Sequence, residues 1–325
     1  MSPNPSVVEY DLVIVGSGIA GLAAARAATA LGLAVKIFDK GRRIGGRATT
    51  RRADGFTFTH GAQFLTARSD EFRDVCEAAL AGGALTSWQI DNKAAFIGRP
   101  TMRDFAAFLG RDLAISQAVE ITGIEAADNH LHFYSADGMV ASGQRAIVTP
   151  PAPQTAALLR QLAPALARAA DGAVYAPCWT AMFGFDEAPP LPATPEPLQF
   201  DDGAIALANC EANRPGSDSS NFALTIQASG EWSARHLEDA GEETGQTLLT
   251  ELSHLLGVKM PKPIYEGCHR WRYAKVTKPA ATDRLTSECR RIAIAGDWVI
   301  GPRIEAAFLS GLEAFAQLSE AADLE

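Results

Sequence analysis

The sequence lacks the cysteine spacing of a disulfide framework or a zinc site. Its five cysteines are scattered and odd in number, and no two of them form a C-x-x-C pair. Disulfide-stabilised folds and zinc sites need cysteines in pairs or at recurring spacings. We therefore expect reduced thiols and no bound metal.

An excess of basic residues is also missing. The chain has 29 lysines and arginines against 38 aspartates and glutamates, for a net charge of -9. A nucleic-acid-binding domain typically carries a basic patch and a high isoelectric point, so we expect no nucleic-acid partner. An acidic protein can still bind an anionic cofactor, because local hydrogen-bond donors matter more than net charge.

No segment has the pattern of a membrane anchor or a secretion signal. Residues 1–9 contain Pro3 and Pro5 and no basic region, unlike a signal peptide. The apolar stretch 12–35 is interrupted by Arg26 and by glycines, and its pattern is that of strand, turn and helix. We predict a cytoplasmic, monomeric protein without a membrane partner.

The most informative pattern lies in the first forty residues. Residues 10–15 are typical of a buried strand, 16–21 read GSGIAG, 22–31 favour a helix, and 33–38 predict a second strand that ends at Asp39. A strand, a G-x-G-x-x-G turn, a helix, a second strand and an acid are the parts of a dinucleotide-binding unit. The sequence therefore predicts a Rossmann-like domain.

Each glycine of this turn has a separate role. Gly16 permits the tight turn, Gly18 lets the backbone approach a pyrophosphate, and Gly21 lets the helix pack on the strand. Ile19 and Ala20, which lead into the predicted helix, would present free amide groups to phosphate together with the positive end of the helix dipole.

Asp39 is expected to accept hydrogen bonds from the adenosine ribose hydroxyls. A carboxylate there disfavours a 2′-phosphate, so FAD or NAD is favoured over NADP in this slot. The neighbouring Lys40, Arg42 and Arg43 weaken that exclusion.

Two further segments favour FAD over NAD. In the run 43–50, RIGGRATT, adjacent glycines allow close approach to the cofactor and Arg47 can reach phosphate oxygens. Near the other end, a strand 291–295 precedes Gly296 and Asp297, and a helix is predicted from Arg303, with Pro302 suited to the first helical position. Asp297 could hold a ribityl hydroxyl or simply cap the helix. The helix start, including Ile304 and Glu305, would stabilise reduced flavin.

Taken together, these segments resemble a family. The chain is similar to the GxGxxG/GG-motif flavoproteins, which include amine oxidases, phytoene desaturases and protoporphyrinogen oxidases, and most of all to bacterial renalases. The resemblance rests on residues 60–66 (HGAQFLT), 269–274 (HRWRYA), 295–298 (AGDW) and 305–311 (EAAFLSG), with weaker agreement at Asn213-Arg214-Pro215-Gly216. One departure is that the acid usual near the GAQ segment is absent from residues 57–60 (TFTH).

The resemblance implies an activity and a set of contacts. Such enzymes oxidise the 2- and 6-dihydro isomers of NAD(P) to NAD(P)+ on non-covalent FAD, and dioxygen then yields hydrogen peroxide. The site residues would be His60, Gln63, Trp271, Arg272 and Tyr273. Further cofactor contacts would come from Gly61, Ala62, Gln63 and the backbone near Val119.

Hydride transfer from a dihydropyridine needs no strong base, because aromatisation drives it, and the sequence shows no convincing acid–base pair. Trp271 and Tyr273 would be flat walls for a nicotinamide-like ring, and Arg272 could hold a phosphate or carboxamide oxygen. A structural histidine at 60 and core packing of the aromatic residues remain open. An amine oxidase or desaturase of a small substrate, and a non-redox flavoprotein, are the alternatives.

The fold prediction is α/β plus α+β, with a Rossmann-like FAD-binding domain and a smaller inserted mixed-sheet substrate domain. The FAD-binding domain is assigned to 1–66, 100–155 and 286–325, and the substrate domain to 67–99 and 156–285. Helices are predicted at 69–82, with Ser69 as its cap, at 101–109, at 154–170 with a break at Pro164, and at 242–256, where Gly257 ends the helix. Strands are predicted at 115–121, 131–140, 145–149, 179–185 and 222–227, and the segment 131–140 is predicted to turn at Asp137-Gly138.

Overall fold

The computed structural model describes residues 8–90, 92–192, 194–215, 217 and 221–320. Gly216, at the end of one resembling segment, lies outside them. The chain forms two compact units, one of 1–46, 106–174 and 276–325 and the other of 47–105 and 175–275. These bounds differ from the predicted domains: 47–66 and 100–105 belong to the second unit, and 156–174 and 276–285 to the first.

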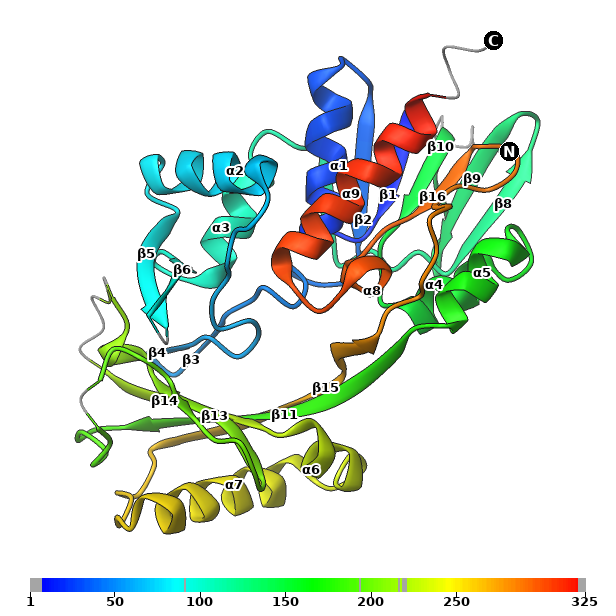
Figure 1. Ribbon diagram of the computed structural model, residues 1–325. Helices are drawn as coiled ribbons and strands as arrows, with labels where there is room; N and C mark the ends of the chain where they lie inside the picture. The colour runs from blue at the N-terminus through cyan, green and yellow to red at the C-terminus, as the bar shows by residue number, and fades with distance from the viewer. Residues whose placement is uncertain (1–7, 91, 193, 216, 218–220, 321–325) are drawn as a thin grey trace. The chain divides into compact units, whose positions relative to one another are not determined.

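The first unit is built on a seven-stranded sheet. Its strands run in the order β7-β2-β1-β10-β9-β8, and β16 also pairs with β10 (Figure 1). β7, β2, β1, β10 and β16 pair in parallel, whereas β8 and β9 pair antiparallel to their neighbours. The strands are β1 (Glu9–Val15), β2 (Val35–Asp39), β7 (Ile115–Gln117), β8 (Gly123–Ala127), β9 (His130–Ser135), β10 (Gly138–Val148) and β16 (Ile292–Ile294).

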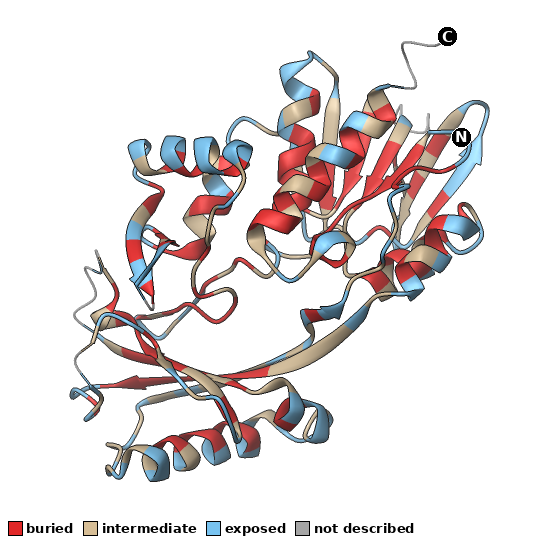
Figure 2. Cartoon of the chain, viewed as in Figure 1, coloured by how far each residue is buried: buried red, intermediate tan, exposed pale blue. Residues whose placement is uncertain are grey.

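Two long helices of this unit lie side by side, α1 (Ile19–Ala30) and α9 (Ile304–Ser319) (Figure 1). A Cβ on Gly311 of α9 would come within 2.2 Å of the carbonyl oxygen of Ala20, so this crossing requires a glycine. Small buried alanines of α1 allow it to pack closely against the core (Figure 2). The unit also contains α4 (Ala152–Leu159), α5 (Pro164–Asp171), which begins at the predicted proline break, and α8 (Asp297–Ile300).

The second unit contains a five-stranded sheet in the order β12-β13-β14-β11-β15. The pairings β11–β14, β13–β14 and β12–β13 are antiparallel. The buried face of α7 packs on this sheet around Phe183, Leu224 and Leu248. The elements are β11 (Val174–Phe185), β12 (Leu198–Gln199), β13 (Ile205–Cys210), the 3₁₀ turn η1 (Glu211–Asn213), β14 (Phe222–Ala228), α6 (Gly230–Arg235), α7 (Gly241–Leu256) and β15 (Tyr265–Lys278).

Shorter elements complete the chain: β3 (Arg51–Ala53), β4 (Phe56–Phe58), α2 (Asp70–Ala81), β5 (Leu85–Ile90), β6 (Lys93–Gly98) and α3 (Met102–Leu109). The predicted cap of α2 is confirmed, since the Ser69 side chain accepts a hydrogen bond from the Phe72 amide at 3.3 Å. Among the described residues, no helix is long and apolar enough to cross a membrane.

Candidate functional site

The glycine turn of the first unit joins β1 to α1. Gly16 has φ +102°, which favours glycine, and a Cβ there would lie 2.4 Å from the Thr149 hydroxyl oxygen. A Cβ on Gly21 would lie 2.0 Å from the Gly16 carbonyl oxygen. Both residues are therefore glycine because the fold requires it.

Gly18 differs from its neighbours in the turn. Its φ is -71°, an ordinary value for any residue, and a Cβ there would meet no atom of the chain within 4 Å. The fold alone therefore gives no reason for a glycine at this position, whereas a pyrophosphate lying against the backbone does. Gly18 caps α1 without a side-chain hydrogen bond, and no acidic residue lies in the first turn at Ile19 and Ala20. The helix start is thus suited to phosphate.

Asp39 ends β2 beside this turn. Its carboxylate accepts hydrogen bonds from the Ser17 amide, from the Ser17 hydroxyl at 2.7 Å and from the Gly41 amide at 2.6 Å. It also lies next to the backbone of Val119, whose amide donates to the Asp39 carbonyl oxygen at 2.9 Å. A carboxylate has about four acceptor positions, so Asp39 retains capacity for ribose hydroxyls. Lys40 pairs with the exposed Glu120 at 3.6 Å.

The late glycine-rich segment also lies in the first unit. Gly296 follows β16 with φ +154°, and its amide donates to the Ser310 hydroxyl at 2.9 Å. Asp297 is buried and begins the short helix α8. The predicted start of the final helix is wrong by one residue, and Pro302 is not its first residue: α9 begins at Ile304, because Arg303 is extended with φ -139°. Glu305 is buried in the first turn of α9.

In the second unit, three rings form a cluster. The His60 ring stacks on Trp271 with centroids 5.3 Å apart and an interplanar angle of 29°. His269 meets His60 edge-on at 5.4 Å and Trp271 at 4.2 Å. The Trp271 indole nitrogen donates to the His60 carbonyl oxygen at 3.0 Å. The structure therefore brings two predicted site residues together, and it adds His269, which had entered only as part of a resembling segment.

This cluster, His60–His269–Trp271, is electrically neutral in a cationic setting. Burial, together with the electrostatic influence of His269, Arg51 and Arg103, lowers the pKa of His60 to about 3, against the opposing effect of a hydrogen bond with the Phe58 backbone. Burial and then Arg51 also lower the pKa of His269. At neutral pH His60 therefore neither carries a charge nor offers a proton.

The segment Thr59–Gln63 runs through the second unit without helix or strand. A Cβ on Gly61 would lie 2.0 Å from the Arg47 carbonyl oxygen, and the Ala62 amide donates to that same oxygen at 2.9 Å. Arg47 in turn donates to the carbonyl oxygens of Tyr273 and Ala274, at 3.3 and 3.1 Å. Arg47 thus accepts from the Ala62 amide through its carbonyl oxygen, donates to Tyr273 through its guanidinium, and leaves room only for a glycine at Gly61.

A buried ion pair supports this segment. Glu211 and Arg214 lie 3.3 Å apart with side chains 10% and 5% exposed. Glu211 accepts from the Thr59 amide at 2.6 Å and from its hydroxyl at 3.1 Å, and Arg214 donates to the Gln63 carbonyl oxygen at 2.7 Å. Glu211 was not predicted from the sequence. The only available signal was its position, since this carboxylate follows a strand and precedes the run Asn213-Arg214-Pro215 (NRP).

The structure does not bring Arg272 to the ring cluster. Side chains alternate along β15, so Arg272 points to the face opposite Trp271 and Tyr273. Its guanidinium pairs with the exposed Glu238 at 2.7 Å, and Arg270 shares that carboxylate. Tyr273 meets Tyr175 edge-on, with centroids 5.5 Å apart. Arg272 is therefore paired with Glu238 and lies apart from the His60–His269–Trp271 cluster.

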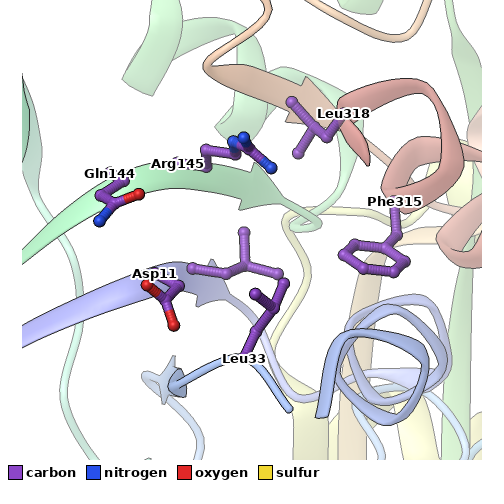
Figure 3. A pocket seen from close by; sticks show the side chains of 7 residues that line it. Asp11, Leu33, Gln144, Arg145, Phe315 and Leu318 are labelled. Atoms are coloured by element: carbon purple, nitrogen blue, oxygen red, sulfur yellow. The ribbon is translucent and has the colours of Figure 1, made fainter. Parts of the chain in front are cut away.

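A small pocket in the first unit does not coincide with any predicted site residue (Figure 3). It has a volume of about 150 Å³ and is lined by Asp11, Leu12, Leu33, Gln144, Arg145, Phe315 and Leu318. These residues include the start of β1, whereas the glycine turn follows its end. The described residues contain no group of three or more His, Cys, Asp or Glu that could hold a metal ion.

The sheet, the glycine turn and Asp39 define a Rossmann-like dinucleotide-binding protein. Residues 14–79 match the model of an NAD(P)-binding Rossmann-like domain, and residues 97–318 match that of flavin containing amine oxidoreductase. The chain belongs to this flavin-containing amine oxidoreductase family, and its cofactor is FAD.

Relatives among known proteins agree with this assignment. A 4,4′-diapophytoene desaturase from Methylomonas sp is 41% identical over 68 residues, and putrescine oxidase from Kocuria rosea is 36% identical over 63 residues. These matches cover 20% and 19% of this chain and 13% of each relative's length.

Solved structures show the likeness of fold over nearly the whole chain. A candidate protoporphyrinogen oxidase from Exiguobacterium sp. 255-15 superimposes with a TM-score of 0.73 at 15% identity, covering 97% of this chain and 99% of that one. Putrescine oxidase bound to putrescine gives 0.72 at 12% identity, with 96% and 99% covered. The predicted fold class is confirmed: a Rossmann-like FAD-binding domain with a mixed-sheet substrate domain.

Proposed function

We propose that this protein oxidises isomeric dihydronicotinamide dinucleotides, the 2- and 6-dihydro forms of NAD(P), to NAD(P)+. The observation that carries the proposal is the His60–His269–Trp271 cluster, in which the His60 and Trp271 rings stack, both histidines are neutral, and the positive charges of Arg51 and Arg103 act on His60. A flat wall suits a nicotinamide-like ring. A positive potential attracts an anionic dinucleotide and repels an ammonium ion.

The chain's own residues would then bind and orient rather than transfer protons. The glycine turn and Asp39 hold the adenosine and pyrophosphate of FAD, while Trp271 and His60 form the face against which the donor ring lies. Arg51 attracts the substrate phosphates. Bound FAD would supply the redox chemistry, as the acceptor of a hydride from the dihydropyridine and the donor of two electrons to dioxygen, which gives hydrogen peroxide.

Amine oxidation is a second candidate, because relatives of this chain include putrescine oxidase. The two functions differ in the charge that the site must accept: a diamine is cationic, and a dinucleotide is anionic. Arg51 and Arg103 are the cations that lower the pKa of His60, and their positive charge favours the anionic dinucleotide. A non-redox flavoprotein remains as the third reading.

The test is an anaerobic titration of the purified yellow protein. Borohydride-derived dihydronicotinamide isomers are expected to bleach the flavin absorbance near its long-wavelength maximum, and air is expected to restore it with formation of peroxide. Putrescine and other primary amines serve as the comparison. Bleaching by amines alone would establish the second candidate, and bleaching by neither reductant would support the third.

A further inference from the structure

The segment Thr59–Gln63 is an irregular loop that is almost entirely buried. Thr59, His60, Gly61 and Gln63 are all buried, and none of them belongs to a helix or a strand. A buried loop exposes backbone donors and acceptors that water cannot satisfy, so other groups must pair with them. The partners of this loop therefore determine its conformation.

Side chains from distant elements supply these partners. Glu211 accepts from the Thr59 amide at 2.6 Å, Gln227 donates to the Gly61 carbonyl oxygen at 2.7 Å, and Arg214 donates to the Gln63 carbonyl oxygen at 2.7 Å. The loop is held at its first, middle and last residue. His60, which stacks on Trp271, lies between the first two of these points.

Two of the three partners, Glu211 and Arg214, form an ion pair in which both side chains are buried. Glu211 and Arg214 are 3.3 Å apart, and the Arg214 guanidinium lies over the Trp88 ring at 5.7 Å. Burying an ion pair carries a desolvation cost that apolar side chains of similar volume would avoid. An ion pair fixes direction and register, which apolar packing does not, so its presence points to a requirement for geometry.

We infer that Glu211 and Arg214 are positioning residues for the reaction: they clamp the loop Thr59–Gln63 and thereby hold the His60 ring against Trp271 as the wall for the substrate ring. This inference rests on the proposed function, since it takes that wall as the substrate face. Neither residue touches the substrate. The carboxylate that holds Thr59 comes from a point 152 residues further along the chain.

The central test is the double variant Glu211→Met/Arg214→Met, with the exposed pair of α6, Glu231→Met/Arg235→Met, as the control. Apolar replacement of a buried pair preserves folding in known cases, so the double variant separates positioning from stability. We expect a Tm near that of the wild type. The rate constant of flavin reduction should fall roughly 10- to 100-fold, because a small misplacement is costly, with little change in substrate Kd.

A second readout needs neither flavin chemistry nor substrate. Amide hydrogen exchange of the peptide that contains residues 59–63 should become about tenfold faster in the double variant and stay unchanged in the control. If the double variant showed wild-type rates of both amide exchange and flavin reduction, the proposed positioning role of Glu211 and Arg214 would be refuted. Faster exchange without slower reduction would also overturn it, because the loop would then be loosened without consequence.

Arg214→Lys keeps the inference testable if the double variant does not fold. Lysine retains the charge opposite Glu211 but lacks the forked second nitrogen that reaches the Gln63 carbonyl oxygen. A smaller loss, about two- to tenfold, is expected in reduction rate, and no loss would count against the clamp. Should wild-type flavin respond only to amines, the proposed function fails, whereas the exchange measurement still decides on the clamp.

Discussion

The buried, neutral His60 predicts how the stability of the protein depends on pH. Its pKa is lowered to about 3 in the folded chain, whereas an unfolded histidine titrates near 6.5. As pH falls below 6.5, the unfolded chain takes up a proton that folded His60 does not. The contribution of His60 to the free energy of unfolding is therefore fully present above about pH 6.5, the pKa in the unfolded chain. It decreases as the pH falls toward about 3, the pKa in the folded chain.

The size of the effect follows from the two pKa values. Between pH 7 and pH 5 the unfolded histidine goes from mostly neutral to almost fully protonated, while folded His60 stays neutral. The free energy of unfolding should fall by about 2 kcal/mol over this interval, at a limiting slope of about 1.4 kcal/mol per pH unit. His269, whose pKa is also lowered by burial, adds to the loss in the same direction.

The assay compares urea unfolding of the wild type and of His60→Phe at pH 7, 6 and 5. Phenylalanine keeps a flat ring against Trp271 and cannot be protonated. We expect the loss of stability between pH 7 and 5 to be smaller in the variant by about 2 kcal/mol. Parallel pH dependences in the two proteins would refute the assignment of a low pKa to His60, and with it the neutral substrate face.

Four further predictions follow from single side chains. Gly18→Ala should leave the free energy of unfolding within about 0.5 kcal/mol but weaken FAD binding, whereas Gly21→Ala should destabilise the fold itself; equilibrium unfolding and flavin titration separate the two. Asp39→Ala should raise the Kd for FAD, and fully loaded variant protein would contradict its role. Arg51→Gln should raise the Kd for dihydronicotinamide dinucleotides. The rise of that Kd with salt, from about 0.01 to about 0.15 M, should be smaller in the variant than in the wild type, because screening has one less cation to act on. Stopped-flow titration at several ionic strengths measures both effects. Cys289, which is exposed, should be the first cysteine to react with a thiol reagent at neutral pH. Peptide mass mapping identifies the labelled residue, and faster labelling of another cysteine would contradict this prediction.

Local features of the fold could be predicted from the sequence, because their causes are local. Ser69 before α2, Pro164 at the start of α5 and Gly257 after α7 act on their immediate neighbours, and each element begins or ends where these residues predict. The glycine turn and Asp39 are equally local. Only a few consecutive residues determine their geometry.

Elements that depend on tertiary pairing were predicted less well. The predicted turn at Asp137-Gly138 is confirmed by the hairpin β9–β10. The predicted break between 140 and 145 is wrong: β10 continues to Val148, because pairing with β1 and β9 carries it through the polar Gln144 and Arg145. The strand expected at 115–121 ends at Gln117, before Val119. β8 and the hairpin β5–β6 were missed. Packing neighbours override the weak strand propensity of such segments.

The candidate site shows the same division between local and distant causes. His60 and Trp271 could be singled out from their own segments, but their stacking joins residues 211 positions apart. Arg272 was placed beside Trp271 by its position in the motif, and strand alternation puts it on the other face. Glu211 could not be assigned from the sequence, since its partner Thr59 lies 152 residues away and a carboxylate before the NRP run does not by itself indicate a role.

The glycine turn shows why a motif alone does not separate folding from function. Gly16 and Gly21 would be glycine in any protein with this turn, because a Cβ there would meet backbone or side-chain oxygen within 2.4 Å. Gly18 has an ordinary φ and open space, so the folded chain would tolerate alanine. Since the protein gains no stability from glycine at this position and loses some through the unfolded state, the residue is explained by a ligand that needs the backbone itself. A bound pyrophosphate meets that condition. Gly18, which the fold itself does not require to be glycine, thus supports the cofactor assignment.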